Sequence, residues 1–64
     1  MEKYQERVVK ERDDLNDKIV RLVGFLYTDR SDEISRDERC RLESQQVLMQ
    51  EYSRILTERI AAFR

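Results

Sequence analysis

One column of side chains in the second half of the chain combines residue types that could bind a nucleotide. Gln45, Tyr52 and Arg59 recur every seven residues, so they fall on one line of a helix. A tyrosine ring can stack on a base, and an arginine fork can hold a phosphate through two parallel hydrogen bonds. The alternative is that the Tyr52 ring packs while Gln45 and Arg59 extend to solvent, so that the column only sets the register between chains.

Two further groups of residues contain cationic or aromatic side chains that could also contact a nucleotide. Lys18 and Phe25 lie seven residues apart in the first half, and three arginines lie within residues 36–41, near an expected helix start whose free amides also attract anions. Pairing of these arginines with the neighbouring acids is the alternative. The full set of candidate ligand-binding residues is Lys18, Phe25, Arg39, Gln45, Gln46, Tyr52 and Arg59.

Catalytic and metal-binding chemistry has little support in the sequence. Cys40 lies between two arginines near a helix start, which favours the thiolate, but the chain has no His to act as its base. Asp13, Asp14 and Asp17 could offer oxygens to a divalent cation, yet no loop is present to wrap one. There is no Gly-rich phosphate loop and no nucleophile elbow. We therefore expect a binding protein that needs no cofactor.

Two long helices must position these residues. Apolar residues at steps of three, four and seven predict one helix over 3–27, and a second heptad run that includes Leu42, Met49 and Leu56 predicts another over 36–63. Between them, residues 28–35 are rich in Thr, Asp and Ser, which favour turns. Ser35 followed by Glu38 predicts a capping box at the second helix. The predicted fold is all-α, a single antiparallel helical hairpin spanning 1–64.

Length and composition then predict self-association. The chain has 64 residues, no Pro, one Gly and 42% charged residues, which suits one small helical unit whose core alone supplies little stability. A hairpin also leaves apolar side chains outside its facing stripes, and a helical bundle of several copies would cover them. The residues expected at the interface between subunits are Val20, Val23, Leu48, Met49, Ile55 and Leu56.

Charge and hydropathy limit the kinds of partner and the cellular location that we expect. The 13 basic and 14 acidic residues are interleaved, which disfavours duplex nucleic acid. No segment is long and apolar enough to span a membrane, and the first residues lack the apolar core of a signal peptide. With a single thiol, these features predict a cytoplasmic protein.

Two segments resemble a family of small phage-encoded helical-hairpin proteins related to a gene of the crAss-like phages. They are LNDKIVRLVGFL and RCRLESQQVLMQEYSRILTERI, and the resemblance covers residues 8–62. The residues that carry it are Leu15, Lys18, Leu22, Phe25, Leu42, Gln46, Met49, Tyr52, Leu56, Arg59 and Ile60. The resemblance implies a phage setting, in the cytoplasm of an infected bacterium. By analogy with small helical phage proteins that trap immune signals, it implies counter-defence.

The function expected from these features is a non-enzymatic, homo-oligomeric sponge. It would sequester a cyclic or ADP-ribose-derived nucleotide signal in pockets between subunits, with Tyr52 or Phe25 stacking on the base and Arg59, Arg39 or Lys18 holding phosphate. The alternative is an adaptor or inhibitor that docks on a host or phage protein through Val20, Val23, Leu48 and Ile55. A third reading is a structural bundle in which the polar column only fixes assembly.

Overall fold

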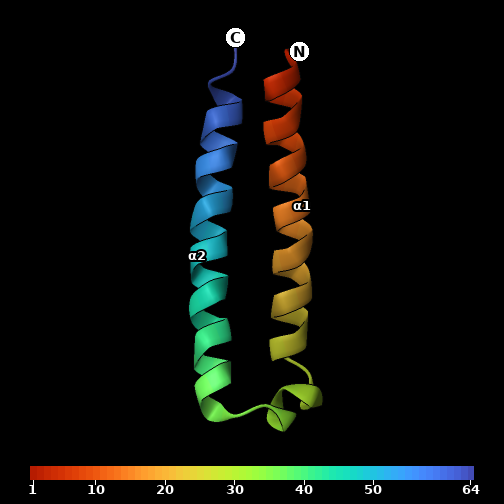
Figure 1. The fold of residues 1–64 in the computed structure, drawn as a ribbon, viewed down its shortest axis with the longest axis vertical. Coiled ribbons are helices and arrows are strands. Elements are labelled where there is room, and N and C mark those ends of the chain that lie inside the picture. The colour runs from red at the N-terminus through yellow and green to blue at the C-terminus, as the bar shows by residue number, and fades with distance from the viewer.

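The computed structural model describes all 64 residues and shows two antiparallel helices joined by a short 3₁₀ segment. Helix α1 spans Lys3–Leu26, the 3₁₀ helix η1 spans Asp29–Glu33, and helix α2 spans Arg36–Ala61. Both termini lie at the same end of a rod of 46 × 15 × 14 Å (Figure 1). The predicted antiparallel helical hairpin is confirmed. Neither helix has an apolar stretch of the length that crossing a bilayer requires.

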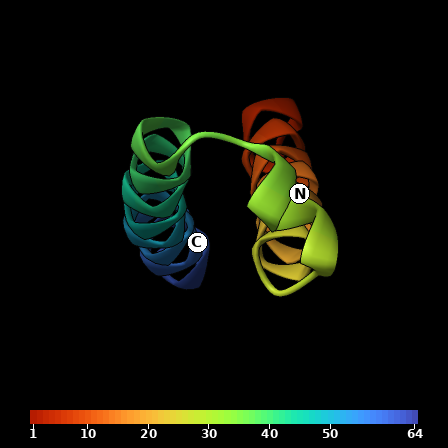
Figure 2. The same ribbon diagram turned by 90° about the horizontal axis from the view of Figure 1, so that it is seen from below.

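Local hydrogen bonds explain where each helix ends. The Tyr27 amide bonds the carbonyls of Val23 and Gly24, and the Thr28 hydroxyl donates to the Phe25 carbonyl at 2.7 Å, so α1 stops one residue before the predicted boundary. Helix α2 ends at Ala61 instead of 63. The end of η1 lies below α1, and an extended segment crosses from it to α2 (Figure 2).

The predicted capping box at α2 forms only in part. The Ser35 hydroxyl accepts the Glu38 amide at 3.1 Å, as the sequence indicates. The Glu38 carboxylate does not return to the cap amide, because it accepts Nε of Arg41 at 2.8 Å instead. A reciprocal pattern forms at the start of α1, where the Gln5 side chain accepts the Glu2 amide at 2.8 Å.

The core between the two helices is small. Val8, Leu26 and Leu56 are its only buried hydrophobic residues, and Leu56 is 0% exposed. The Tyr4 and Phe63 rings meet edge to face with centroids 5.9 Å apart, which closes the open end of the hairpin. The assignment of Leu56 to a surface between subunits is therefore wrong, because the facing stripes of one hairpin already cover it.

Each of the two α-helices packs against only one other α-helix. The two helices form a single layer, and neither broad face of the hairpin is covered by a further element (Figures 1 and 2). Stable domains normally pair at least two layers around a core. The hairpin therefore has more apolar surface than it covers, including Val20 at 70% and Leu48 at 69% exposed.

Candidate functional site

Tyr52 connects the two helices on one broad face. Its hydroxyl donates a hydrogen bond to the Glu11 carboxylate of α1. This hydrogen bond raises the pKa of Tyr52, and partial desolvation and the Glu11 charge act in the same direction, whereas the charge of Arg59 acts against them. On the opposite face, Ser53 donates to the Asn16 side chain at 2.6 Å. These adjacent residues of α2 thus set the register of the hairpin on both of its faces.

A groove of about 530 Å³ runs along α2 beside Tyr52. Its volume is within the range of small-molecule sites. One wall is apolar, with Leu48 and Met49, and the remaining side chains are mostly polar. The lining residues are Cys40, Arg41, Ser44, Gln45, Leu48, Met49 and Tyr52. We call this groove the α2 groove.

A second groove, of about 380 Å³, runs along α1 and includes Tyr52 of α2 in its lining. We call it the interhelix groove. Three of its side chains are cationic and two are acidic, and Lys10 pairs with Asp14 at 2.6 Å. The lining residues are Arg7, Lys10, Glu11, Asp14, Leu15, Lys18 and Tyr52. Tyr52 is the one residue common to both grooves.

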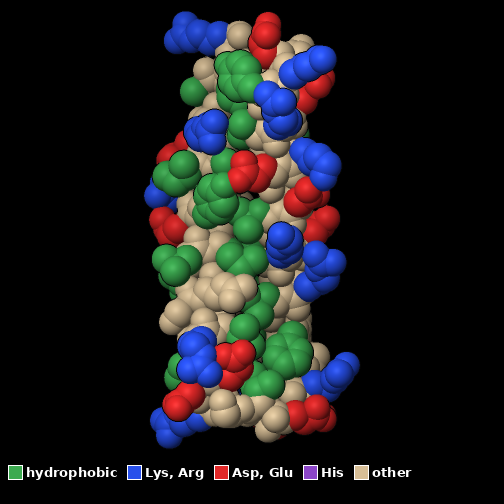
Figure 3. Space-filling model, viewed as in Figure 1, with side chains coloured by type: hydrophobic (Ala, Val, Ile, Leu, Met, Phe, Trp, Pro, Cys, Tyr) green, Lys and Arg blue, Asp and Glu red, His purple; other side chains and the backbone are tan.

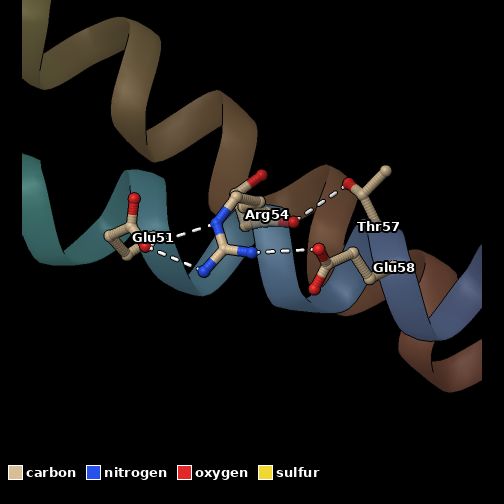
Figure 4. A network of polar contacts seen from close by, with 5 residues as sticks. Glu51, Arg54, Thr57 and Glu58 are labelled. Atoms are coloured by element: carbon tan, nitrogen blue, oxygen red, sulfur yellow. Dashed lines mark hydrogen bonds and ion pairs between the residues drawn. The ribbon is translucent and has the colours of Figure 1, made fainter.

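Three cations at or near these grooves form no ion pair within the hairpin. Arg7, Lys18 and Arg59 are exposed, and their charged groups are partnered by no carboxylate. Arg54 differs, because its guanidinium is bound by Glu51 and Glu58, each at 3.0 Å (Figure 4). An anion could therefore bind Arg59 or Lys18 without first displacing an acid, whereas Arg54 is already neutralised.

Arg39 has a structural role at the far end of the hairpin. Its guanidinium donates to the Ser31 hydroxyl at 2.8 Å and to the Leu26 carbonyl at 3.3 Å, and its Nε contacts Glu43 at 3.3 Å. The last turn of α1 has no basic residue of its own, so Arg39 supplies the positive charge that a helix C-terminus favours. Arg39 and Gln46 line a third groove of about 190 Å³, remote from Tyr52.

The candidate ligand-binding residues thus separate into groups. Tyr52, Gln45 and Lys18 line the grooves on one face, and Arg59 lies close enough to Tyr52 to influence its pKa. Phe25 is half-buried and lines none of the three grooves. The remaining interface candidates also differ in exposure, since Val20, Leu48 and Ile55 are exposed whereas Val23 and Met49 are half-buried.

Several groove residues were absent from the sequence-based set. Glu11, Arg7 and Lys10 line the interhelix groove, and Cys40 and Arg41 line the α2 groove. A signal for Glu11 was present, because Tyr4, Glu11, Lys18 and Phe25 recur every seven residues. The charge of Glu11 made it resemble an ordinary solvated position.

Family comparison adds one decisive observation. A model of the Sequestin family matches residues 2–62, almost the entire chain. This chain belongs to the Sequestin family. No curated protein and no solved structure matches it. The match includes both helices and the connection, and it carries no link to the crAss-like phage gene.

Figure 3 shows one broad face of this Sequestin family member. Hydrophobic side chains form a band along the line where the two helices meet, and charged side chains border the band on both sides. Apolar contact area flanked by cations suits a ligand that has both a flat ring and an anionic group. The same arrangement also suits a second protein surface.

Proposed function

We propose that this protein sequesters a small nucleotide signal without transforming it. The observation that carries the proposal is the position of Tyr52, which lines both larger grooves and has the unpaired charges of Arg59 and Lys18 nearby. The ring supplies a stacking surface and the cations supply phosphate contacts. The family name Sequestin is consistent with binding rather than catalysis.

The setting we propose is a phage protein that opposes bacterial immunity in the cytoplasm of its host. A cyclic or ADP-ribose-derived nucleotide would be held between subunits, and the immune effector would be deprived of its signal. The small core of a single hairpin supports the involvement of more than one chain. Arg39 is not among the proposed phosphate ligands, because its guanidinium bonds Ser31 and the Leu26 carbonyl at the end of α1.

The test is a melting experiment with a panel of cyclic and ADP-ribose-derived nucleotides. A ligand that binds only the folded state raises the free energy of unfolding by RT ln(1 + [L]/Kd), and the melting temperature rises with it. We expect a rise for at least one nucleotide, and its loss in Tyr52→Ala and in Arg59→Ala. Arg54→Ala is the matched control, because it removes an exposed arginine of the same helix whose charge is already paired.

A second candidate function follows from the exposed apolar residues. Val20 and Leu48, on α1 and α2, are exposed at 70% and 69%, which would suit docking on a host or phage protein by helix-in-groove packing. If no nucleotide raises the melting temperature, the sequestration of a nucleotide is wrong, and this adaptor function becomes the better account.

A further inference from the structure

Two arginines on different helices lie near Tyr52 and have no acidic partner. Arg7 of α1 lines the interhelix groove together with Tyr52. Arg59 of α2 follows Tyr52 by seven residues, about two helical turns, so its side chain leaves α2 on the same side. The charge of Arg59 acts on the Tyr52 hydroxyl, because it opposes the rise in the pKa of that group. We call Arg7 and Arg59 the arginine pair.

Two contacts between the helices place the arginine pair at one level of the hairpin. An edge-to-face contact of two aromatic rings closes the open end, and the Tyr52–Glu11 hydrogen bond lies further along. Arg7 precedes Glu11 by four residues and Arg59 follows Tyr52 by seven, so both arginines lie between these contacts and on one face. Packed helices are about 8–10 Å apart, a gap that two long arginine side chains can close over one ligand.

The sequence offers neither arginine a free acid at the spacing that forms ion pairs in this hairpin. Five of its six ion pairs join residues three or four apart in one helix. Arg59 has only apolar residues at these spacings. Arg7 has one acid, Glu11, and that carboxylate accepts the Tyr52 hydroxyl instead. The arginine pair is therefore open to an anion from outside the chain.

Two unpaired charges of the same sign at one level favour an anion between them. The two guanidinium groups repel each other in the free protein, and a bound anion removes this repulsion. Each guanidinium also presents parallel N–H groups that match phosphate oxygens. A single phosphate suits one such group, whereas a diphosphate has oxygens on two adjacent phosphorus atoms and can satisfy both groups at once.

The third unpaired cation of this region is too distant to share the same anion. Lys18 follows Arg7 by 11 residues, which is about 16 Å along α1. Glu11, which holds the Tyr52 hydroxyl, lies between Arg7 and Lys18 in α1. Lys18 is therefore on the far side of this contact from the arginine pair, where it can meet only a different part of the ligand.

We infer that Arg7 and Arg59 form a diphosphate subsite that spans the two helices beside Tyr52. One hairpin contains the whole subsite, so its formation does not depend on how copies associate. Arg59 and Tyr52 are seven residues apart, about 10 Å along α2. A base joined to the diphosphate through a sugar can cover this distance and stack on the Tyr52 ring.

The inference deepens the proposed function, on which it rests for the nucleotide that carries the diphosphate. It also narrows the class of ligand. Nucleotides that contain a diphosphate, as ADP-ribose derivatives do, should bind more tightly than cyclic dinucleotides, whose phosphates are separated by sugars. The reason is that only adjacent phosphates can contact both arginines together.

The Tyr52–Glu11 hydrogen bond keeps the subsite available. In Tyr52→Phe the stacking ring remains, but the Glu11 carboxylate is released and can pair with Arg7, four residues before it. Diphosphate binding should therefore weaken in Tyr52→Phe although no arginine is changed. Glu11→Gln removes the competing negative charge, so diphosphate binding should strengthen.

Inorganic pyrophosphate tests the subsite without a base or a sugar. At low ionic strength, melting curves should show tighter binding of pyrophosphate than of orthophosphate or sulfate. Arg7→Ala and Arg59→Ala should each weaken pyrophosphate binding about tenfold, through the loss of one charge-assisted contact. Arg7→Lys should restore part of the affinity. Arg54→Ala is the matched control and should bind as the wild type does, because the charge of Arg54 is already paired.

Each remaining outcome decides the matter. Equal binding of pyrophosphate, orthophosphate and sulfate overturns the subsite, as does a loss in Arg54→Ala as large as that in Arg7→Ala. Binding of pyrophosphate that needs only one of the two arginines also overturns it. Pyrophosphate binding through both arginines, without binding of any nucleotide, leaves the subsite intact and defeats the proposed function. A nucleotide that binds through Tyr52 and is unaffected by Arg7→Ala does the reverse.

Discussion

Tyr52 of α2 donates its hydroxyl hydrogen to the carboxylate of Glu11 of α1, a residue 41 positions earlier in the chain. The contact lies on the face that carries both larger grooves, with the charge of Arg59 acting on the same hydroxyl. A single side chain therefore helps to fix the helix register, borders both grooves and is subject to the charge of Arg59. The protonation state of Tyr52 therefore affects both the stability of the hairpin and the face that carries the two grooves.

The first prediction concerns the pH dependence of this contact. Because the pKa of Tyr52 is raised in the folded chain, the folded state retains the phenolic proton more strongly than the unfolded state does. The stability from this linkage is complete below the ordinary tyrosine pKa and disappears as the pH rises through the raised value. The wild-type chain should therefore lose more helicity in this alkaline window than Tyr52→Phe does.

Tyrosinate absorbance at 295 nm measures this pKa directly. The wild-type titration minus that of Tyr52→Phe isolates the curve of Tyr52. Replacement of Glu11 by Gln removes the carboxylate, which is the largest cause of the shift, and should lower the midpoint. An unchanged midpoint in Glu11→Gln would show that the hydroxyl is not held by this carboxylate in solution.

The second prediction concerns Arg39, which joins α2 to the end of α1. Arg39→Ala removes hydrogen bonds to the Ser31 hydroxyl and the Leu26 carbonyl, and leaves both without a charged partner. We expect a loss of about 1–2 kcal/mol in the free energy of unfolding, because hydrogen bonds to charged groups exceed neutral ones and this site is partly exposed. Urea denaturation at one fixed protein concentration measures the loss.

The matched control is Arg54→Ala, in the exposed network of Figure 4. Arg54 contacts only acids of its own helix, so its removal should destabilise the chain less than removal of Arg39 does. Ser31→Ala should reproduce part of the Arg39 effect. Equal losses for Arg39 and Arg54 would mean that the connection does not depend on the Arg39 contacts.

The hairpin could be predicted from the sequence because its determinants are local. Apolar residues at steps of three and four define one stripe on each helix, with Leu15 and Leu22 on α1 and Leu56 on α2. The cluster of Thr, Asp and Ser marks the connection. The position of Ser35 as the cap of α2 follows from the same local chemistry. Such signals need only neighbours in the chain.

Contacts that depend on the relative rotation of the helices could not be predicted in the same way. Which acid of α1 meets Tyr52 depends on the axial offset of the hairpin, which the apolar stripes specify only to about one helical turn. The contacts of Arg39 depend on the path of η1, a segment whose composition indicates a turn but not its shape. For these reasons Glu11 was missed and Arg39 was placed among phosphate ligands.

The third prediction contrasts two leucines of α2. Leu56 is 0% exposed and Leu48 is 69% exposed, although both are leucines of the same helix. Leu56→Ala should reduce the free energy of unfolding by about 2–4 kcal/mol through lost burial and a cavity. Leu48→Ala should have little effect on a dilute monomer, and should weaken the chain increasingly at concentrations where wild-type copies associate.

Thermal melts over a range of protein concentrations separate these effects. A dimer makes the melting temperature rise with concentration, and Leu48→Ala should reduce that slope while Leu56→Ala lowers every value. Val20→Ala tests whether an exposed apolar residue of α1 contributes to the same association. A Leu48 variant that retains the full slope would show that Leu48 lies outside the interface.

The fourth prediction uses Cys40 as a reporter of the α2 groove. This cysteine is exposed, forms no disulfide and lines the groove together with Gln45 and Tyr52. A nucleotide in the groove should slow alkylation of the thiol by limiting access of the reagent. A cysteine introduced at Val20 in a Cys40→Ser background should react at the same rate with or without the nucleotide. Slowing at both positions would indicate a global change and not occupancy of the groove.

The fifth prediction concerns Gly24, the only glycine of the chain. The sequence offered two explanations for it, a close approach of a neighbouring helix or an early end of the first helix. Helix α1 does end at Leu26, and a Cβ built at Gly24 meets nothing within 4 Å. The residue is exposed, and its backbone is not left-handed. Gly24 therefore lowers helix stability without relieving a contact within the hairpin.

Gly24→Ala should accordingly raise the free energy of unfolding by about 0.5–1 kcal/mol, because alanine restricts the unfolded chain and has the higher helix propensity. Gly24→Gln tests whether a second copy approaches this position. Gly24 is exposed and has no neighbour within 4 Å of a Cβ, so the larger side chain should also be tolerated, and both variants should sediment as the wild-type does. Stabilisation by Ala combined with a lower sedimenting mass of the Gln variant would instead place a second copy against Gly24.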